Sequence, residues 1–364
     1  MIILPYVESD PSPNTDSMKQ QNLIGVTQEE LSSLVGELGE PPFRARQLYY
    51  AIYRRQCLDW QRMTDLSRAF RMRIAEGFTL DLPQVLEVRS SQDGAEKFLL
   101  GLQDGRVIEM VYIPEPRRDT LCISSQVGCN VGCRFCVTGT LGFKRNLSAG
   151  EIIAQVLLCA QQKPGILKSL NLVFMGMGEP LLNYDEVMKA VRLLTDPPGM
   201  AISPRRITLS TCGIVPGLER LARETIIPLL AVSLGSPRDD LRNELIPVNR
   251  QWNLELLLTA CAAIPLKKWI TFEYTLLRGM NDRPEDARAL VRLLSRFPAK
   301  VNLIPFNPHP ALPFERSDPQ AIAVFQGILF DSGISTFLRR SRGEDIQAAC
   351  GQLAAGQERM VGGV

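Results

Sequence analysis

The chain has 364 residues, a net charge of +2, nine cysteines and only one histidine. A single histidine excludes the two-histidine zinc helix of metalloproteases, and it confines any Ser-His-Asp triad to His309, which lies between two prolines. The near-neutral charge excludes nucleic-acid binding through a global positive field, so any such binding requires a local basic patch.

The N-terminal segment, residues 1–26, is predicted to be a mobile tail. Met1 to Val7 are mildly apolar but include no basic residue and no cleavage signal, so they are not typical of a signal peptide. No apolar stretch approaches the ~18 residues that a membrane-spanning helix needs. We therefore expect a cytoplasmic protein without membrane contact. In that reducing compartment, clustered cysteines serve as metal ligands or catalytic thiols more often than as disulfides.

Residues 27–80 are predicted to form a small helical module. Thr27 and Glu30 have the spacing of an N-terminal capping box, and apolar residues recur at helical spacing beyond them. Residues 41–75 contain eight arginines and two aspartates, with six aromatic residues interleaved. Because arginine and aromatic side chains suit phosphates and stacked bases, the module is a candidate RNA-binding surface. The alternative is an ordinary solvated helical face with its own core.

Residues 81–118 are predicted to form a β-meander that links this module to the rest of the chain. Three short runs, Gln84–Arg89, Glu96–Leu102 and Arg106–Ile113, have the alternating pattern of strands. Asp-Gly pairs at residues 93–94 and 104–105 separate them, and such a pair between alternating runs strongly indicates a hairpin turn.

Residues 119–355 alternate between strand and helix patterns. Repeated β–α units imply an α/β fold with a parallel sheet, which is either open or rolled into a full or partial barrel. Residues 356–364 are left as a C-terminal tail. The expected strands are Thr120–Ser124, Leu170–Met175, Arg206–Ser210, Leu229–Ser233, Ile270–Leu277, Val301–Pro305 and Ser335–Leu338.

Three cysteines, Cys129, Cys133 and Cys136, lie within eight residues of one another. A zinc site normally has four protein ligands, often as two separated pairs, and the candidate fourth ligands Cys122 and His309 lie elsewhere. Three thiolates on a 4Fe-4S cluster leave one iron open to a substrate or cofactor. The count therefore favours an iron–sulfur cluster, with structural zinc as the alternative.

Five further motifs accompany this group in order along the chain. They are Thr120–Cys129, Met175–Leu181, Leu209–Gly213, Asn302–Pro308 and Arg342–Leu353. With the cysteine group, they closely resemble the RlmN/Cfr family of radical S-adenosylmethionine (SAM) RNA adenine methyltransferases over about residues 27–355. The resemblance implies a radical SAM partial (β/α) barrel as the catalytic core, residues 119–355.

The resemblance also implies roles for individual residues. The 4Fe-4S cluster would be bound by Cys129, Cys133 and Cys136. The SAM site would be formed by Gly178, Glu179, Ser210, Ser233, Leu234, Gly235 and Asn307. The catalytic groups would be Cys350 as the methyl-carrying thiol, Cys122 as the resolving thiol and Glu109 as a proton acceptor. The implied partners are 23S rRNA, with tRNA as an additional candidate, and an electron donor such as flavodoxin or ferredoxin, and the expected state is a monomer.

Methylation of adenine carbon 2 needs thiols outside the cluster. A ring carbon has no lone pair with which to attack a sulfonium methyl group, whereas a thiolate is a strong nucleophile. One SAM would methylate Cys350, and a second SAM, cleaved by an electron from the cluster, would give the radical that activates the S-methyl group. Glu109 would then take the ring proton, and Cys122 would release the product and leave a transient Cys122–Cys350 disulfide.

Alternatives to this scheme stay open at the level of sequence. Cys122 in a strand and Cys350 near a turn are each compatible with simple packing roles. Methylation of carbon 8, as in Cfr-type enzymes, is the alternative within the same chemistry, and a zinc-stabilised RNA-binding protein without catalysis is the alternative from another class. Two positions depart from the family pattern: Gly235 replaces the usual histidine, and Cys212, which we expect to be structural, replaces a common serine.

Overall fold

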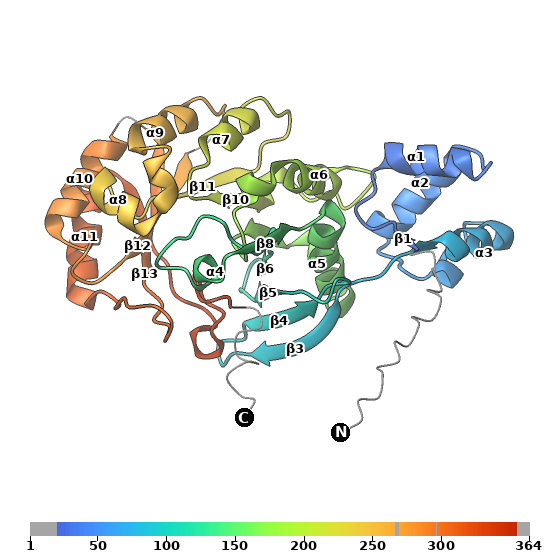
Figure 1. Ribbon diagram of the computed structural model, residues 1–364, viewed down its shortest axis with the longest axis horizontal. Coiled ribbons are helices and arrows are strands. Elements are labelled where there is room, and N and C mark those ends of the chain that lie inside the picture. Colours follow the sequence, from blue (N-terminus) through green and yellow to red (C-terminus); the bar gives the residue numbers. More distant parts are fainter. Residues whose placement is uncertain (1–19, 266–268, 296, 355–364) are drawn as a thin grey trace, which may run out of the picture.

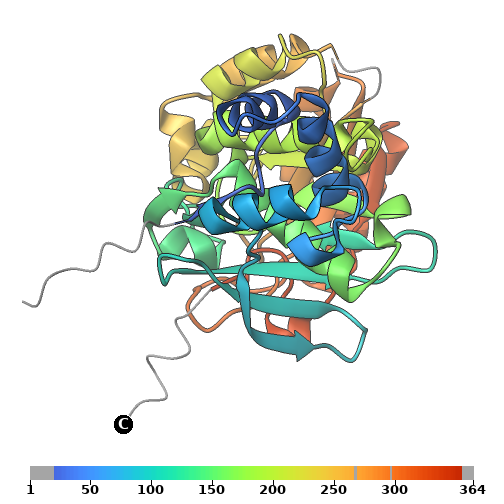
Figure 2. The ribbon, with the colours of Figure 1, turned by 90° about the vertical axis from the view of Figure 1, so that its right-hand side faces the viewer.

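The computed structural model describes residues 20–265, 269–295 and 297–354 (Figure 1). A helical domain at the N-terminal end is joined to a larger α/β body, and viewed from its own end the domain stands in front of the sheet of the body (Figure 2). The predicted C-terminal tail, residues 356–364, and most of the N-terminal tail lie outside the described residues. In the described ranges, no helix is both long enough and apolar enough to span a membrane.

The helical domain begins before the predicted boundary at residue 27. Strand β1 pairs in parallel with β2, and Leu23 just after β1 is fully buried. Thr27 and Glu30 each accept a hydrogen bond from the other's main-chain amide, which confirms the predicted capping box. The elements of the domain are β1 (Gln21–Asn22), α1 (Gln28–Glu37), α2 (Phe43–Tyr49), the π-helix η1 (Tyr50–Arg54), the 3-10 helix η2 (Trp60–Arg62), α3 (Arg68–Gly77) and β2 (Phe78–Thr79).

One mixed sheet forms the centre of the body. In the part of the chain that the structure describes, its ten strands have the order β14-β13-β12-β11-β10-β9-β6-β5-β4-β3. Neighbouring strands from β14 to β6 are parallel, and each of the seven predicted parallel strands is found. The strands are β3 (Gln84–Ser90), β4 (Glu96–Gly101), β5 (Val107–Ile113), β6 (Thr120–Cys122), β9 (Asn171–Phe174), β10 (Ile207–Thr211), β11 (Leu229–Ser233), β12 (Ile270–Leu276), β13 (Ala299–Pro305) and β14 (Ser335–Leu338).

Helices follow the parallel strands along one curved side of the sheet (Figure 1). Because every β–α unit returns the chain in the same direction, the carboxyl ends of these strands meet at one edge of the sheet. The helices are α5 (Ala149–Gln162), α6 (Tyr184–Thr195), α7 (Val215–Leu221), α8 (Asp239–Leu245), α9 (Leu254–Ala262), α10 (Pro284–Leu294) and α11 (Pro319–Asp331). Short 3-10 helices are η3 (Ile166–Lys168), η4 (Pro180–Asn183), η5 (Pro204–Arg206), η6 (Pro247–Arg250) and η7 (Glu344–Ile346).

The predicted meander extends the main sheet. Strands β3, β4 and β5 pair antiparallel, as expected, and β5 also pairs antiparallel with β6, with Val111 opposite Cys122. Gly94 and Gly105 have φ values of +87° and +77° at the two predicted turns, a conformation that glycine adopts without strain. The first strand of the parallel core therefore has the meander as its direct neighbour.

The turn between β3 and β4 holds the segment that follows β14. Arg342 forms an ion pair with Asp93 at 3.0 Å, and the Gly343 amide donates to the same carboxylate at 2.9 Å. The Ser91 hydroxyl donates to Asp345. We call these two segments, residues 91–93 and 342–345, the clasp. The clasp fixes the chain just before Cys350 against the meander.

Candidate active site

The three clustered cysteines lie in a loop whose ends are joined by a small sheet. Strands β7 (Gln126–Gly128) and β8 (Phe143–Asn146) pair antiparallel, and the short helix α4 (Val137–Thr140) follows the last cysteine. A Cβ atom on Gly128, which has a φ of +73°, would lie 1.9 Å from the carbonyl oxygen of Gly142, so this closure requires glycine. The Cys129 amide donates to that same oxygen at 3.2 Å.

Cys129, Cys133 and Cys136 line one cavity of about 150 Å³, which we call the cluster cavity. It lies at the carboxyl ends of β9, β10, β11 and β12, where ligands bind in folds of this kind. Five residues of the predicted SAM site line it as well: Gly178, Glu179, Ser210, Ser233 and Asn307. The structure thus gathers the three cysteines and most of the predicted SAM residues around one space.

The arrangement of the thiols fits a 4Fe-4S cluster. In the described residues, no three cysteine, histidine, aspartate or glutamate side chains converge on a position that a single metal ion could occupy. A structural zinc site requires four such donors on one ion, so this arrangement gives zinc no support. In a cubane each thiolate binds a different iron, and three thiols spread around a shared cavity suit that ligation.

Glu179 is held in the wall of the cluster cavity by donors from two strands' ends. Its carboxylate accepts hydrogen bonds from the amides of Leu181 at 3.0 Å and Cys212 at 2.9 Å, and from the Cys212 thiol at 3.0 Å. Burial raises the pKa of Glu179. Cys212, expected to be merely structural, therefore contacts a predicted SAM residue and lines the cavity itself. Its position directly after strand β10 was the signal available in the sequence.

Arg242 ties together the ends of β10 and β11 from behind the cavity. Its side chain is completely buried, and it donates to the carbonyl oxygens of Cys212 at 2.6 Å and Leu234 at 2.9 Å and to the side chain of Asn249. Leu234 and Gly235 are not among the described residues that line the cluster cavity. Gly235 has a φ of +70°, which favours glycine over histidine.

A second cavity, of about 400 Å³, adjoins the first and contains both Cys122 and Cys350; we call it the thiol cavity. Cys350 lines both cavities, and Asn307 donates to its carbonyl oxygen at 3.1 Å. Both cysteines are free thiols, as are the other seven, so the disulfide between them stays a prediction. The residues common to the two walls are Met175, Glu273, Ile304, Asn307, Cys350 and Gly351.

The two thiols are protonated more strongly than ordinary cysteines. Burial raises the pKa of Cys122, and its neighbour Cys350 adds to the effect. Cys350 is exposed to the cavities, yet desolvation by the surrounding protein and the nearby Glu273 raise its pKa as well. At neutral pH, each thiol therefore needs a partner that accepts its proton before it can act as a nucleophile.

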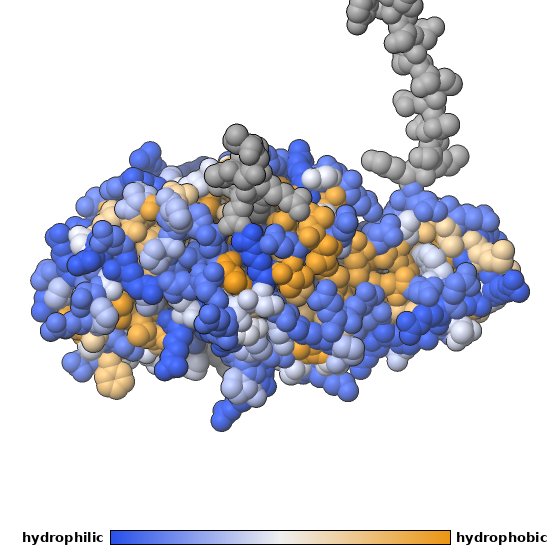
Figure 3. All heavy atoms as spheres, turned by 90° about the horizontal axis from the view of Figure 1, so that it is seen from below, coloured by the Kyte–Doolittle hydropathy of each residue, from blue (hydrophilic) through white to orange (hydrophobic). Residues whose placement is uncertain are grey.

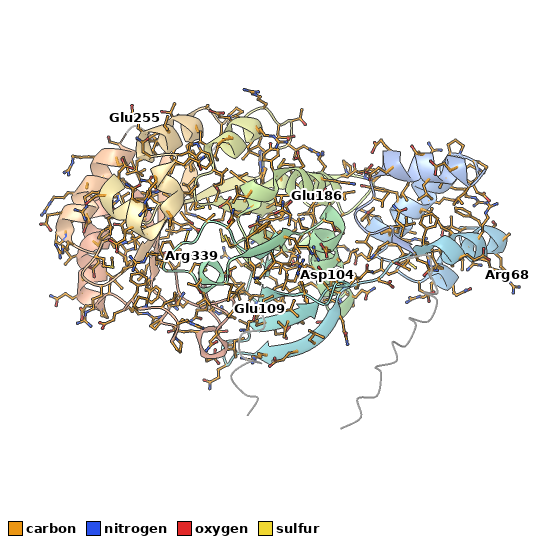
Figure 4. The ribbon with its side chains drawn as sticks, viewed as in Figure 1. Arg68, Asp104, Glu109, Glu186, Glu255 and Arg339 are labelled. Atoms are coloured by element: carbon orange, nitrogen blue, oxygen red, sulfur yellow. The ribbon has the colours of Figure 1, made fainter. Side chains whose placement is uncertain are left out.

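Glu109 lies on β5 beside the thiol cavity but is not among the described residues that line it. It is buried, it forms an ion pair with Lys97 at 3.2 Å, and it accepts a hydrogen bond from the Ala354 amide at 2.8 Å. Side chains two apart on a strand share a face, so Glu109 points to the same side as Val111, which does line the cavity. In Figure 4, Glu109 is labelled in the lower central part of the molecule, and Arg339 is labelled above it and to its left.

The helical domain uses many of its arginine and aromatic residues internally. Tyr49, Tyr53 and Phe70 are buried, and they form part of the core of the domain. Phe43 and Tyr50 remain exposed. The arginines that are exposed and that make no ion pair in the described residues are Arg46, Arg54, Arg62 and Arg68, the last at the far tip of the domain (Figure 4). Figure 3 also shows a hydrophobic region that extends from the middle of the molecule toward this domain.

Comparisons with known proteins cover both the domain and the body. Residues 123–293 match the radical SAM superfamily, and residues 21–80 match the ribosomal RNA large subunit methyltransferase N-terminal domain. The dual-specificity RNA methyltransferase RlmN of Syntrophobacter fumaroxidans is 52% identical over 331 residues, which cover 90% of this chain and 96% of that one. Its counterpart in Halorhodospira halophila is 47% identical over 335 residues, 91% of this chain and 92% of that one.

A solved structure agrees with these relatives. The crystal structure of a radical SAM methyltransferase from Sphaerobacter thermophilus has a TM-score of 0.87 and 43% identity, and the match covers 92% of this chain and 99% of that one. The predicted fold, the methyltransferase class and the two cofactors, a 4Fe-4S cluster and SAM, are thereby confirmed, and the non-catalytic zinc alternative is not favoured. The chain belongs to the RlmN family of radical SAM RNA methyltransferases.

Proposed function

We propose that this chain transfers a methyl group from SAM to carbon 2 of an adenosine in 23S rRNA, with tRNA as a second substrate, by way of Cys350. The observation that carries the proposal is the position of Cys350 in the wall shared by the cluster cavity and the thiol cavity. A methyl carrier has to meet SAM on one side and RNA on the other, and Cys350 borders both spaces. The names of the relatives, dual-specificity RNA methyltransferases, support two classes of RNA substrate.

In the cluster cavity, Cys129, Cys133 and Cys136 would hold the 4Fe-4S cluster. When bound, the cluster supplies the electron that cleaves SAM reductively. The predicted SAM contacts that line the cavity would surround the cofactor, while Leu234 and Gly235 would support it from the strand end behind them. Gly178 lets the main chain approach closely, because a Cβ atom there would lie 2.5 Å from the side chain of Gln126.

In the thiol cavity, the side chains would take consecutive roles. Cys350 would accept the methyl group from one SAM, and the activated methyl carbon would then join the ring carbon of adenine. Glu109 would accept the ring proton from its position beside Val111. Cys122 would finally attack the sulfur of Cys350, and this would free the methylated RNA and form the transient disulfide.

RNA would enter the thiol cavity at the open edge of the sheet. Strand β14 is the last strand at this edge, and the wall that follows it is strongly basic. Phe337 on β14 is 52% exposed, and the ammonium group of Lys300 lies 4.6 Å from the centre of its ring. An exposed ring beside cations suits a stacked base with its phosphates. The basic residues of this wall are Lys300, Arg339, Arg340 and Arg342.

The helical domain would add contacts to the RNA backbone. Arg46, Tyr50 and Arg54 follow one another at intervals of four residues across α2 and η1, and all three are exposed. Such a row of cations with a ring would bind phosphates without reading sequence. We further propose that the enzyme acts in the cytoplasm as a monomer and receives its electrons from a flavodoxin or a ferredoxin.

The decisive experiment is nucleoside analysis of RNA treated with the reconstituted holoenzyme, SAM and a reductant. We expect 2-methyladenosine in a 23S rRNA fragment and in tRNA, and none with the C350A variant. Appearance of 8-methyladenosine would overturn carbon 2 as the target. Absence of any methylated adenosine, with SAM cleavage intact, would overturn the proposed substrate.

A further inference from the structure

Glu273 lies in the wall between the two cavities and has no role in the scheme above. It projects from β12, is 9% exposed, and lines both the cluster cavity and the thiol cavity. The hydroxyl of Ser210 donates to its carboxylate at 3.3 Å. Among the described residues, Glu179 lines only the first cavity and Glu115 only the second, so Glu273 is the carboxylate that both walls share.

Charged groups from several elements face Glu273. Arg339 after β14 and Lys300 on β13 are the cations, and Cys122 on β6 and Cys350 are the neighbouring thiols. The polar neighbours are Ser210 and Asn302. Burial raises the pKa of Glu273, while the two cations oppose that shift. The carboxylate is therefore more basic than an ordinary glutamate but keeps partners that stabilise its charge.

Cys350 needs such a neighbour. A thiol becomes an effective nucleophile only after it loses its proton, and the surroundings of Cys350 disfavour the thiolate. The cluster cavity, where SAM would bind, offers two carboxylates. Glu179 is already engaged by two amides and one thiol, which leaves Glu273 as the carboxylate with capacity to accept a proton.

We propose that Glu273 is the general base for the methylation of Cys350. The inference rests on the proposed function, because it assumes that Cys350 receives the methyl group of SAM. The S–H bond of Cys350 breaks and its proton passes to the carboxylate of Glu273, while the electron pair stays on sulfur. The sulfur attacks the methyl carbon, the bond between that carbon and the sulfonium sulfur breaks, and its electron pair stays with S-adenosylhomocysteine. The proton then leaves Glu273 through the thiol cavity.

This role is separate from that of Glu109. Glu109 is paired with Lys97 and bonded to Ala354, and it lines neither cavity in the described residues. Glu273 borders the space on the SAM side of Cys350, where the first methyl transfer would occur. The two carboxylates would thus serve two different proton transfers.

The test isolates the first methyl transfer. Holoenzyme with a free Cys350 thiol is mixed with SAM in the absence of RNA and reductant, and S-methylation of the Cys350 peptide is followed by mass spectrometry from neutral to alkaline pH. The variants are E273Q, E273D and, as the matched control, E255Q, whose carboxylate is exposed on α9 and lines neither cavity. SAM affinity is measured on the same samples by equilibrium dialysis.

We expect E273Q to slow methylation by about 10²–10⁴-fold at neutral pH, the usual contribution of a positioned base. The deficit should shrink as pH rises, because hydroxide then removes the thiol proton. E273D should keep part of the rate, and E255Q should match the unaltered protein. An E273Q rate within about threefold of normal overturns the proposal, and so does a deficit that is constant with pH and equal to the loss of SAM affinity.

A measurement on the unaltered protein covers the case in which the variants do not fold. With an internal base, the rate of Cys350 methylation levels off once Glu273 is ionised. Without one, it rises about tenfold per pH unit up to the pKa of the thiol, and that profile overturns the proposal. Failure of the proposed function looks different, because Cys350 would then stay unmethylated in the unaltered holoenzyme at every pH.

Discussion

The cluster cavity and the thiol cavity share a wall, but they are built in different ways. The walls of the first are set by strand ends, a loop closed by Gly128, and Arg242, which binds two main-chain carbonyls. The walls of the second carry several cations and an exposed ring, and its last segment is held by the clasp. The first cavity is therefore a small space framed by main-chain ends and suits a cofactor, whereas the second is larger and basic and suits RNA.

The largest expected effect on RNA methylation comes from replacing Cys350, which lies where the two cavities meet. The C350A variant should lose all detectable RNA methylation, because the proposed methyl carrier is removed. SAM cleavage should persist, since Cys350 is not among the residues that would bind the cluster. The measurement is methylated adenosine alongside 5′-deoxyadenosine in the same reaction. Loss of both products would contradict the separation of the two cavities.

Replacing Cys122 should block only the release of RNA from Cys350, a step that would occur in the thiol cavity. In the C122A variant, the covalent link between Cys350 and RNA should form but not break, so an enzyme–RNA adduct should accumulate on denaturing gels. Replacing the half-buried Cys57 of the helical domain with alanine is the matched control and should leave turnover unchanged. If the C122A variant releases methylated RNA at the normal rate, the two-thiol scheme is wrong.

Replacing Arg242 should impair SAM binding in the cluster cavity but not RNA binding in the thiol cavity. The R242M variant removes the donors that Arg242 gives to the buried carbonyl oxygen of Cys212 and the buried side-chain oxygen of Asn249, which should lower the free energy of unfolding by about 2–4 kcal/mol. SAM affinity should fall, while RNA affinity should stay within about twofold of normal. Chemical denaturation and two binding titrations measure these effects. Arg288, exposed on α10, is the control position, and its methionine variant should change stability little.

Replacing Phe337 should give the smallest effect. It should weaken RNA binding and spare SAM binding, whereas replacing Arg242 should weaken SAM binding and spare RNA binding. The F337A variant should weaken RNA binding by about 1–3 kcal/mol through lost stacking, with SAM affinity unchanged. Because the ring carries no charge, the dependence of RNA affinity on salt should stay the same. R340Q, its neighbour on the same wall, should instead reduce that salt dependence. If RNA affinity depended on salt concentration to the same extent in both variants, that result would argue against a stacking role for Phe337.

The features that were predictable from sequence are those with a local pattern. The three cysteines, the capping box at Thr27 and the Asp-Gly turns each depend on residues close together in the chain, and the structure places each of these local elements as expected. The parallel strands were found because each is a short apolar run between helical stretches. Strand β1 was missed because two residues carry no periodicity.

Other features depend on contacts that no local pattern reveals. Arg242 lies in a run of charged residues on α8 that resembles a solvated helical face, yet it is completely buried. Glu273 looks like one polar residue in an apolar strand until the sheet places it beside Cys350. In the helical domain, Tyr49 and Tyr53 were grouped with surface aromatics, but their spacing of four residues puts both on the buried face.

The clasp has a consequence for how the enzyme is made. Its two segments, which include Asp93 and Arg342, are separated by 249 positions along the chain. A ribosome completes the meander long before it reaches Arg342, and the strands from β6 to β14 emerge in the interval. The clasp can close only after nearly all of the described chain has been synthesised. The nascent protein therefore acquires Cys350, the proposed methyl carrier, only after the walls that would contain a radical have been synthesised.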